Sequence, residues 1–323
     1  MPAGDATSEV DSALDPELIA AGRLFARLGI APVDILTTPV HEARLRVRAY
    51  QAVCNADPPP LASVFERWTD DGMVRVRLYH PASAPVLPCY IHLHGGGFAL
   101  GDLDTSDRFL RLIAAESGIV VCGVDYALAP EARFPVQLEQ VLRVVGWIAA
   151  SGQEFGVDTA RLAIGGDSAG ANLALSAMLA LRDGHVDLMR QGVLVYPMLS
   201  PAAETESHEL FGDGRFGLST ARLDWFWRSY VDTAAMLTDP RVAPLAADFT
   251  GLPPQLIVAA ALDPLRDDAN LLAEKLAEAG IAHQVSLYQQ LPHGFVQLTR
   301  FVTAARAAAS EVAETLKTSL AAG

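Results

Sequence analysis

A serine lies at the centre of a glycine-rich segment that is typical of a hydrolytic nucleophile. Residues 166–170 read Gly-Asp-Ser-Ala-Gly and fit the pattern G-x-S-x-G, in which Ser168 sits on a sharp turn between a strand and a helix. The flanking runs are apolar enough for a buried strand before the serine and a buried helix after it. So tight a turn needs small residues on both sides, which Gly166 and Gly170 supply. The alternative is a glycine-rich helix start without chemistry.

Two later residues could activate the hydroxyl of Ser168. A neutral alcohol attacks an ester poorly, so the serine needs a base, and the base needs an orienting carboxylate. Asp263 directly follows an apolar run, and His293 stands in Leu-Pro-His-Gly-Phe beyond the last predicted strand. Hydrolases with this serine turn place serine, acid and histidine in that order along the chain. We therefore predict Asp263 as the acid and His293 as the base.

The neighbouring acids and the other histidines are assigned structural roles. Asp267 and Asp268 fall at the start of the next predicted helix, where acidic side chains are favoured. We expect His80 to end a strand and His92 to be a core residue or to lie on a sheet face. Four further histidines on polar or helical stretches are predicted to be solvated: His41, His185, His208 and His283.

A second glycine-rich segment could stabilise the negative charge that develops on the substrate oxygen. Residues 94–98 read His-Gly-Gly-Gly-Phe and follow a predicted strand, as a corresponding loop does in lipases and esterases. Glycines let backbone N–H groups approach an oxyanion closely. We predict the N–H groups of Gly96, Gly97 and Ala169 as the donors. A glycine hinge is the alternative; a phosphate loop is disfavoured because no lysine follows.

The order of the predicted elements indicates how these residues could be brought together. Helical stretches within 15–54 come first, and strands at 62–68 and 73–80 form a predicted hairpin. From residue 88 onward strands alternate with helices, and the last helix is predicted over 295–316. Such alternation implies an α/β fold with a mostly parallel central sheet covered by helices on both faces.

Residues 197–250 interrupt this alternation. They hold an aromatic cluster on a predicted helix after Ser219 and Thr220. Core packing explains such a stripe, and so does a lid that helps to form an acyl pocket; in this position it could do both. We predict an acyl or alcohol pocket lined by Phe98, Trp225, Phe226 and Tyr230.

Composition limits the classes of partner. Of the 323 residues, 51% are hydrophobic and 19% are charged, which supports a sizeable core, and the formal net charge is −14. Such acidity argues against nucleic acid and weakens attraction to anionic membranes. The three cysteines make neither a disulfide framework nor a metal-ligand spacing, so we expect no metal. The N-terminal residues lack the features of a signal peptide, and no run offers about 18 uncharged apolar residues, so we expect a cytoplasmic protein.

Several separate motifs, in order, give the chain a specific resemblance. It resembles the hormone-sensitive lipase-like (bacterial family IV) esterases from about residue 15 to 316. The motifs are His-Gly-Gly-Gly-Phe at 94–98, Gly-Asp-Leu-Asp-Thr at 101–105, Asp-Tyr-Ala-Leu-Ala-Pro-Glu at 125–131, Phe-Pro at 134–135, Gly-Asp-Ser-Ala-Gly at 166–170, Asp-Pro-Leu-Arg-Asp-Asp at 263–268 and His-Gly-Phe at 293–295. The departures are Ala127, where the family usually has arginine, and Leu291-Pro292 before the histidine.

The resemblance implies the α/β-hydrolase fold with a helical cap. The cap would comprise the N-terminal helices of residues 1–54 and the insertion 197–250, and the catalytic domain would comprise 55–196 and 251–323. The family's Gly-Asp-Ser-Ala-Gly branch places an aspartate where others have threonine, and we expect Asp167 to help hold the serine loop. Many relatives form dimers, so a homodimer is expected.

The predicted function is hydrolysis of short to medium acyl esters by a serine carboxylesterase without a cofactor. Deacetylation or amide hydrolysis of a small metabolite would use the same machinery and stays open. A ligand receptor on this fold, like the plant hormone receptors that resemble these esterases, would depart from the triad at the histidine. Because His293 is present, the esterase is favoured over the receptor.

Overall fold

The computed structural model describes residues 10, 12–83 and 86–321. The remaining residues of the predicted segments 1–54, 55–196 and 251–323 lie outside this description. They include most of the N-terminal residues on which the signal-peptide prediction rests. An eight-stranded sheet forms the centre, in the order β1-β2-β4-β3-β5-β6-β7-β8. The strands are β1 (Ser63–Trp68), β2 (Arg75–His80), β3 (Leu87–Leu93), β4 (Val120–Asp125), β5 (Val157–Asp167), β6 (Met189–Val195), β7 (Gln255–Leu262) and β8 (His283–Pro292).

Pairing in the sheet is parallel except at one edge. The predicted hairpin strands β1 and β2 pair antiparallel, and β2 also pairs antiparallel with β4. All pairings from β4 through β3, β5, β6 and β7 to β8 are parallel. Inner strands such as β3 and β7 are buried along nearly their whole length, as apolar strands covered on both faces must be.

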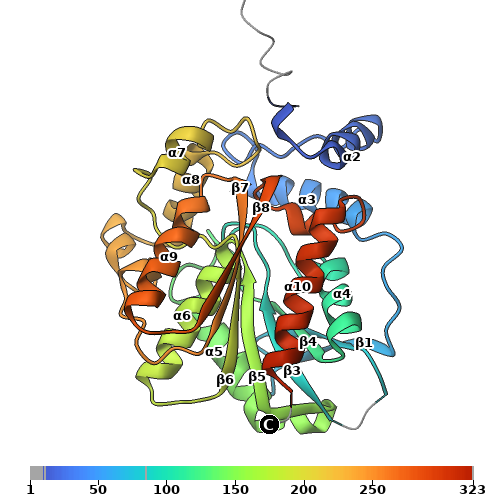
Figure 1. The fold of residues 1–323 in the computed structure, drawn as a ribbon, viewed down its shortest axis with the longest axis vertical. Helices are drawn as coiled ribbons and strands as arrows, with labels where there is room; N and C mark the ends of the chain where they lie inside the picture. Colours follow the sequence, from blue (N-terminus) through green and yellow to red (C-terminus); the bar gives the residue numbers. More distant parts are fainter. Residues whose placement is uncertain (1–9, 11, 84–85, 322–323) are drawn as a thin grey trace, which may run out of the picture.

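Helices cover both faces of this sheet, as the sequence predicts. One face carries α4 (Asp107–Ser117) and α10 (Thr303–Ser319), which contact each other (Figure 1). The other face carries α5 (Val136–Ser151), α6 (Ala169–Asp183) and α9 (Arg266–Glu278). The predicted mostly parallel α/β architecture is confirmed.

Four more helices lie at one end of the sheet (Figure 1): α2 (Pro16–Arg27), α3 (Val40–Cys54), α7 (Glu206–Phe211) and α8 (Thr220–Tyr230). Strands β7 and β8 run toward this end, so the helices lie near the carboxyl ends of the parallel strands. Short 3₁₀ helices, η2 (Ala234–Thr238) and η3 (Pro244–Ala246), complete the segment 197–250. The division into a catalytic domain and a cap stays a prediction.

The predicted last helix over 295–316 is wrong as a single element. The chain forms a 3₁₀ helix, η4 (Phe295–Leu298), and α10 begins only at Thr303. Between them the backbone N–H groups of Phe301 and Val302 both donate to the carbonyl of Leu298, and Val302 is extended. The break follows from packing, because Phe295 is buried in the core while the Arg300 guanidinium donates to the carbonyl of Val53 in α3.

Candidate active site

The three residues predicted to carry the chemistry lie together in the structure. The Nε2 atom of His293 is 2.9 Å from the hydroxyl oxygen of Ser168, and its Nδ1 atom is 2.7 Å from Oδ2 of Asp263. Each residue directly follows the carboxyl end of a parallel strand: β5, β7 and β8 respectively. Strands β5 and β8 each run up to the residue before the site residue that follows them.

The backbone at Ser168 is held in a strained conformation. Its φ of 57° and ψ of −118° lie outside the regions that non-glycine residues favour. A Cβ atom on Gly166 would come within 2.4 Å of the Leu93 carbonyl oxygen, and one on Gly170 within 2.0 Å of the same atom. No larger residue fits at either position, so the two glycines let the turn press against β3 and present the serine above it.

Asp263 is fixed by its own loop. Its side chain is fully buried, and Oδ1 accepts a hydrogen bond of 2.9 Å from the backbone N–H of Leu265. The other oxygen is thereby left facing His293. The ring of Tyr196, which follows β6, packs against the His293 ring with centroids 4.5 Å apart. Tyr196 is a positioning neighbour that the sequence reasoning missed; its place after an apolar strand at the same sheet edge was the available signal.

The glycine loop that follows β3 has the backbone shape that only glycine adopts readily. Gly96 and Gly97 have φ angles of 119° and 61°. A Cβ on Gly96 would lie 2.3 Å from the Leu100 carbonyl oxygen, and one on Gly97 would lie 2.2 Å from the Phe226 ring. Within the described part of the chain, the N–H groups of Gly96, Gly97 and Ala169 donate to no protein acceptor.

A buried network joins this loop to the serine turn. One carboxylate oxygen of Asp167 accepts a hydrogen bond of 2.9 Å from the N–H of Gly95, and Nε2 of His92 lies 3.3 Å from the same oxygen. The hydroxyl of Tyr196 is 3.4 Å from the other oxygen. Burial would raise the pKa of Asp167, but His92, His94 and the Gly95 N–H together keep it below its ordinary value. Asp167 therefore links β5 to the glycine loop as an anion, and His92 is a core residue that pairs with it.

A cavity of about 460 Å³ adjoins His293. Its walls come from α2, α3, the segment between them and the start of α8. The lining residues are Gly22, Phe25, Ala26, Ile30, Ala31, Pro32, Val33, Val47, Tyr50, Gln51, Gly217, Leu218, Arg222, His293 and Gln297. Most are apolar, as is usual for a small-molecule site.

The four aromatic residues predicted to line an acyl or alcohol pocket do not line this cavity. None of them is among the residues that line this cavity. Phe98 and Tyr230 are fully buried and stack on each other with ring centroids 3.8 Å apart. Phe226 is also buried and covers Gly97, with Trp225 against its edge. Phe98, Phe226 and Tyr230 thus pack within the core, and Trp225 is half-buried against it.

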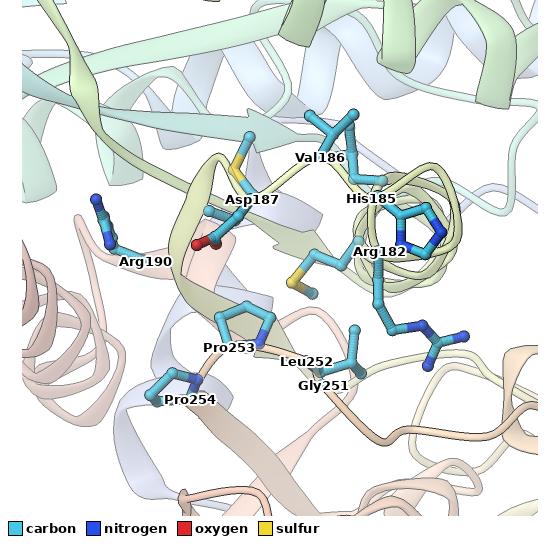
Figure 2. Close-up of a pocket in the computed structure, with 12 residues that line it drawn as sticks. Arg182, His185, Val186, Asp187, Arg190, Gly251, Leu252, Pro253 and Pro254 are labelled. Carbon is cyan, nitrogen blue, oxygen red and sulfur yellow. The ribbon is translucent and has the colours of Figure 1, made fainter.

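A second hollow of about 540 Å³ lies away from the three site residues (Figure 2). Arg182 and His185, at the end of α6, lie on one side of it, and Pro253 and Pro254, just before β7, lie on another. These residues stand at the amino end of β7, whereas Asp263 follows its carboxyl end. The hollow therefore opens at the other edge of the sheet.

One prediction about a polar side chain is wrong, and the burial of another polar side chain was not predicted. His208, predicted to be solvated, is buried where α7 packs against α9, and its Nδ1 lies 3.0 Å from the Thr220 hydroxyl. Asp268, predicted as a helix-start charge, does lie in the first turn of α9 but is fully enclosed. Its Oδ2 accepts hydrogen bonds from the N–H groups of Leu199 and Ser200, 2.7 and 3.1 Å away. It therefore anchors the loop after β6.

The burial of Asp268 predicts a pH dependence of stability. Burial raises the pKa of its carboxyl to about 7, and the nearby Asp263 and Asp267 add to the rise. The unfolded carboxyl releases its proton near about pH 4, so between these values the native state binds more protons and stability falls as pH rises. Asp268→Asn keeps an acceptor for both N–H groups and removes the charge.

Urea unfolding of both proteins between about pH 5 and 8 measures this effect. The wild type should lose about 2.5 kcal/mol of free energy of unfolding relative to Asp268→Asn as the pH rises from about 5 to 8, because the part of the effect below about pH 5 precedes this range. Two curves that stay parallel over this range would show that the carboxyl is not protonated in the native state.

Within the described ranges, no cluster of three or more His, Cys, Asp or Glu side chains could hold a metal ion. Cys54, Cys89 and Cys122 are all buried and unpaired by disulfides. No helix among the described residues is both long enough and apolar enough to cross a membrane.

Comparison with known protein sequences places the chain among hydrolases. A family model of the alpha/beta hydrolase fold matches residues 90–297. The carboxylic ester hydrolase LipN of Mycobacterium tuberculosis is 34% identical over 326 residues, covering 95% of this chain and 83% of that protein. An acetyl esterase of Salmonella paratyphi A is 34% identical over 254 residues, covering 78% of each chain.

Solved structures agree. An α/β hydrolase enzyme from the metagenome of Lake Arreo has 35% identity and a TM-score of 0.88, over 95% of this chain and 98% of that one. A thermostable esterase from Pseudomonas putida ECU1011 has 28% identity and a TM-score of 0.90, over 99% and 100% of the two chains. The chain's relatives are enzymes named carboxylic ester hydrolase, acetyl esterase and esterase. The chain therefore belongs to the alpha/beta hydrolase family and is an enzyme.

Proposed function

We propose that the protein is a serine carboxylesterase that hydrolyses short to medium acyl esters through an acyl-enzyme intermediate. The observation that carries this proposal is the continuous contact from Asp263 through His293 to Ser168, at 2.7 and 2.9 Å. Nucleophile, base and orienting acid within hydrogen-bond reach are what an activated serine requires. Relatives named as ester hydrolases and acetyl esterases support the same reaction class.

In the first half-reaction, Ser168 Oγ attacks the ester carbonyl while His293 Nε2 takes the hydroxyl proton. The Asp263 carboxylate accepts a hydrogen bond from Nδ1–H of His293 and stabilises the imidazolium that forms. The oxyanion of the tetrahedral intermediate accepts hydrogen bonds from the N–H groups of Gly96, Gly97 and Ala169, which donate to no protein acceptor within the described residues. Collapse breaks the bond to the alcohol, which leaves with the proton from His293.

In the second half-reaction, His293 takes a proton from water, which attacks the acyl group on Ser168. The same three donors stabilise the second oxyanion, and the carboxylic acid leaves as the proton returns to the Ser168 oxygen. The free enzyme is restored without a cofactor. Because His293 stands in reach of Ser168, turnover is favoured over the non-catalytic receptor function.

A panel of 4-nitrophenyl esters from acetate to palmitate tests this function. We expect hydrolysis with kcat/KM highest for the short acyl chains and a steep fall by palmitate, because the 34% identical relative from Salmonella paratyphi A is named an acetyl esterase. Initial rates followed by 4-nitrophenolate release give the profile. Maximal activity on emulsified long-chain triglyceride would contradict the substrate class, and no turnover of any ester would overturn the proposed function.

A further inference from the structure

The cavity beside His293 contains a single fixed charge. Among the described side chains that line it, Arg222 is the only arginine or lysine, and no aspartate or glutamate faces it. The rest of the wall is chiefly apolar, and its other polar side chains are those of Tyr50, Gln51, His293 and Gln297. In a chain of net charge −14, an arginine without an acid beside it in this cavity calls for an explanation.

The hydrogen-bonding capacity of Arg222 is largely unused. Its Nη1 donates to the carbonyl of Gly217 over 2.8 Å, while its Nε is buried and has no partner within the described chain. No carboxylate of the described residues makes an ion pair with it. Asp34 acts on Arg222 electrostatically, but its carboxylate oxygens accept hydrogen bonds from the Leu36 N–H and the Thr37 hydroxyl.

An arginine in this state is a site for an anion. Burial lowers the pKa of Arg222, yet a guanidinium remains charged at all ordinary pH values. Buried donors in native proteins normally have an acceptor, so an unpaired buried N–H indicates a partner from outside the chain. The planar fork of N–H groups matches a carboxylate, and one guanidinium neutralises one carboxylate. A phosphate dianion would leave a buried negative charge, so the carboxylate is the better fit.

We propose that Arg222 is a specificity-determining residue that binds a carboxylate carried by the ester substrate. In this arrangement the carboxylate lies against the guanidinium and the ester carbonyl lies at Ser168, whose hydroxyl oxygen is 2.9 Å from Nε2 of His293, a residue of the cavity wall. This inference rests on the proposed esterase function. The carboxylate belongs either to the acyl part, as in a half-ester of a dicarboxylic acid, or to the alcohol part.

Two pairs of substrates separate these sources. For the acyl part, the 4-nitrophenyl half-ester of adipic acid is compared with the 4-nitrophenyl ester of adipic acid monoamide, which has the same shape and no charge. For the alcohol part, 4-acetoxybenzoate is compared with 4-acetoxybenzamide. Each arm yields the ratio of kcat/KM for the charged ester to that for the neutral one, so differences in intrinsic reactivity cancel between variants.

Wild type and three variants are measured with both pairs. Arg222→Gln should lower the ratio at least tenfold in one arm while the neutral esters are still hydrolysed. Arg222→Lys, which keeps the charge without the fork, should lower it less. The matched control is Arg228→Gln on the same helix, because Arg228 is exposed and pairs with Asp224 on the surface. That variant should leave both ratios unchanged.

Two results would overturn the proposal. The first is a ratio that Arg222→Gln leaves unchanged in both arms. The second needs no variant: a wild-type enzyme that discriminates against the carboxylate in both arms. A wild-type enzyme that hydrolyses neither the neutral nor the charged esters would instead count against the esterase function itself.

Discussion

Replacing Ser168 by alanine is expected to lower kcat for a short 4-nitrophenyl ester by roughly 10⁶-fold, because no other hydroxyl stands in reach of His293 Nε2 among the described contacts. The backbone donors and the cavity stay in place, so the variant should retain a residual rate of about 10³–10⁴ over water. KM should change little, since the hydroxyl acts in bond making and not in holding the substrate. Stopped assays at high enzyme concentration measure the residual rate.

The matched control is Ser176→Ala, which removes a buried hydroxyl from α6, the helix that follows Ser168. Ser176 lies in α6 and its hydroxyl has no described partner, so its loss should leave kcat near the wild-type value. A Ser168→Ala variant with full activity would remove the nucleophile from the proposed mechanism. Equal losses in both variants would point to a folding defect, which circular dichroism detects.

Replacing Asp263 by asparagine is expected to lower kcat by about 10⁴-fold. The N–H of Leu265 holds the residue in place, and in the variant that donor would still need the amide oxygen. The amide NH₂ would then face His293 Nδ1 and force this atom to act as acceptor. The histidine proton would move to Nε2, which could no longer take the proton of Ser168.

Rates at neutral pH for Asp263→Asn and for Asp267→Asn test this account. Asp267 lies four residues further on, in the first turn of α9, and accepts from the N–H of Ser207, away from His293. Its replacement should change kcat by less than about threefold, as expected for a position outside the reacting groups. An Asp263→Asn variant as active as Asp267→Asn would contradict the orienting role.

Most of the fold and the three central site residues could be predicted because they depend on local pattern and chain order. Glycines flank Ser168 since the turn tolerates nothing larger, and an apolar strand precedes Asp263. These signals lie within a few residues of each position. The alternation of apolar strands with helices likewise predicts the parallel sheet without knowledge of any contact between distant residues.

Features that depend on contacts between distant segments could not be predicted in this way. The cavity wall brings residues of α2 and α3 together with residues at the start of α8, and no local sequence pattern indicates that these segments meet. Core packing was one of the two explanations that the aromatic stripe left open, and the contact of Tyr230 with Phe98 depends on a distant segment. The position of Asp268 at a helix start could be predicted, whereas its burial depends on the distant loop at Leu199. The break before α10 arises from packing of the preceding 3₁₀ helix, which sequence periodicity does not record.

The central claim is that Ser168 is the nucleophile of an ester hydrolase, and covalent labelling tests it most directly. The enzyme is incubated with diethyl 4-nitrophenyl phosphate, and intact mass, peptide mapping and remaining esterase activity are followed together. We expect one diethylphosphoryl group per chain, located on Ser168, with activity lost in proportion to labelling and no labelling of Ser168→Ala. An adduct on another residue, or full labelling of Ser168 with activity retained, would contradict the central claim.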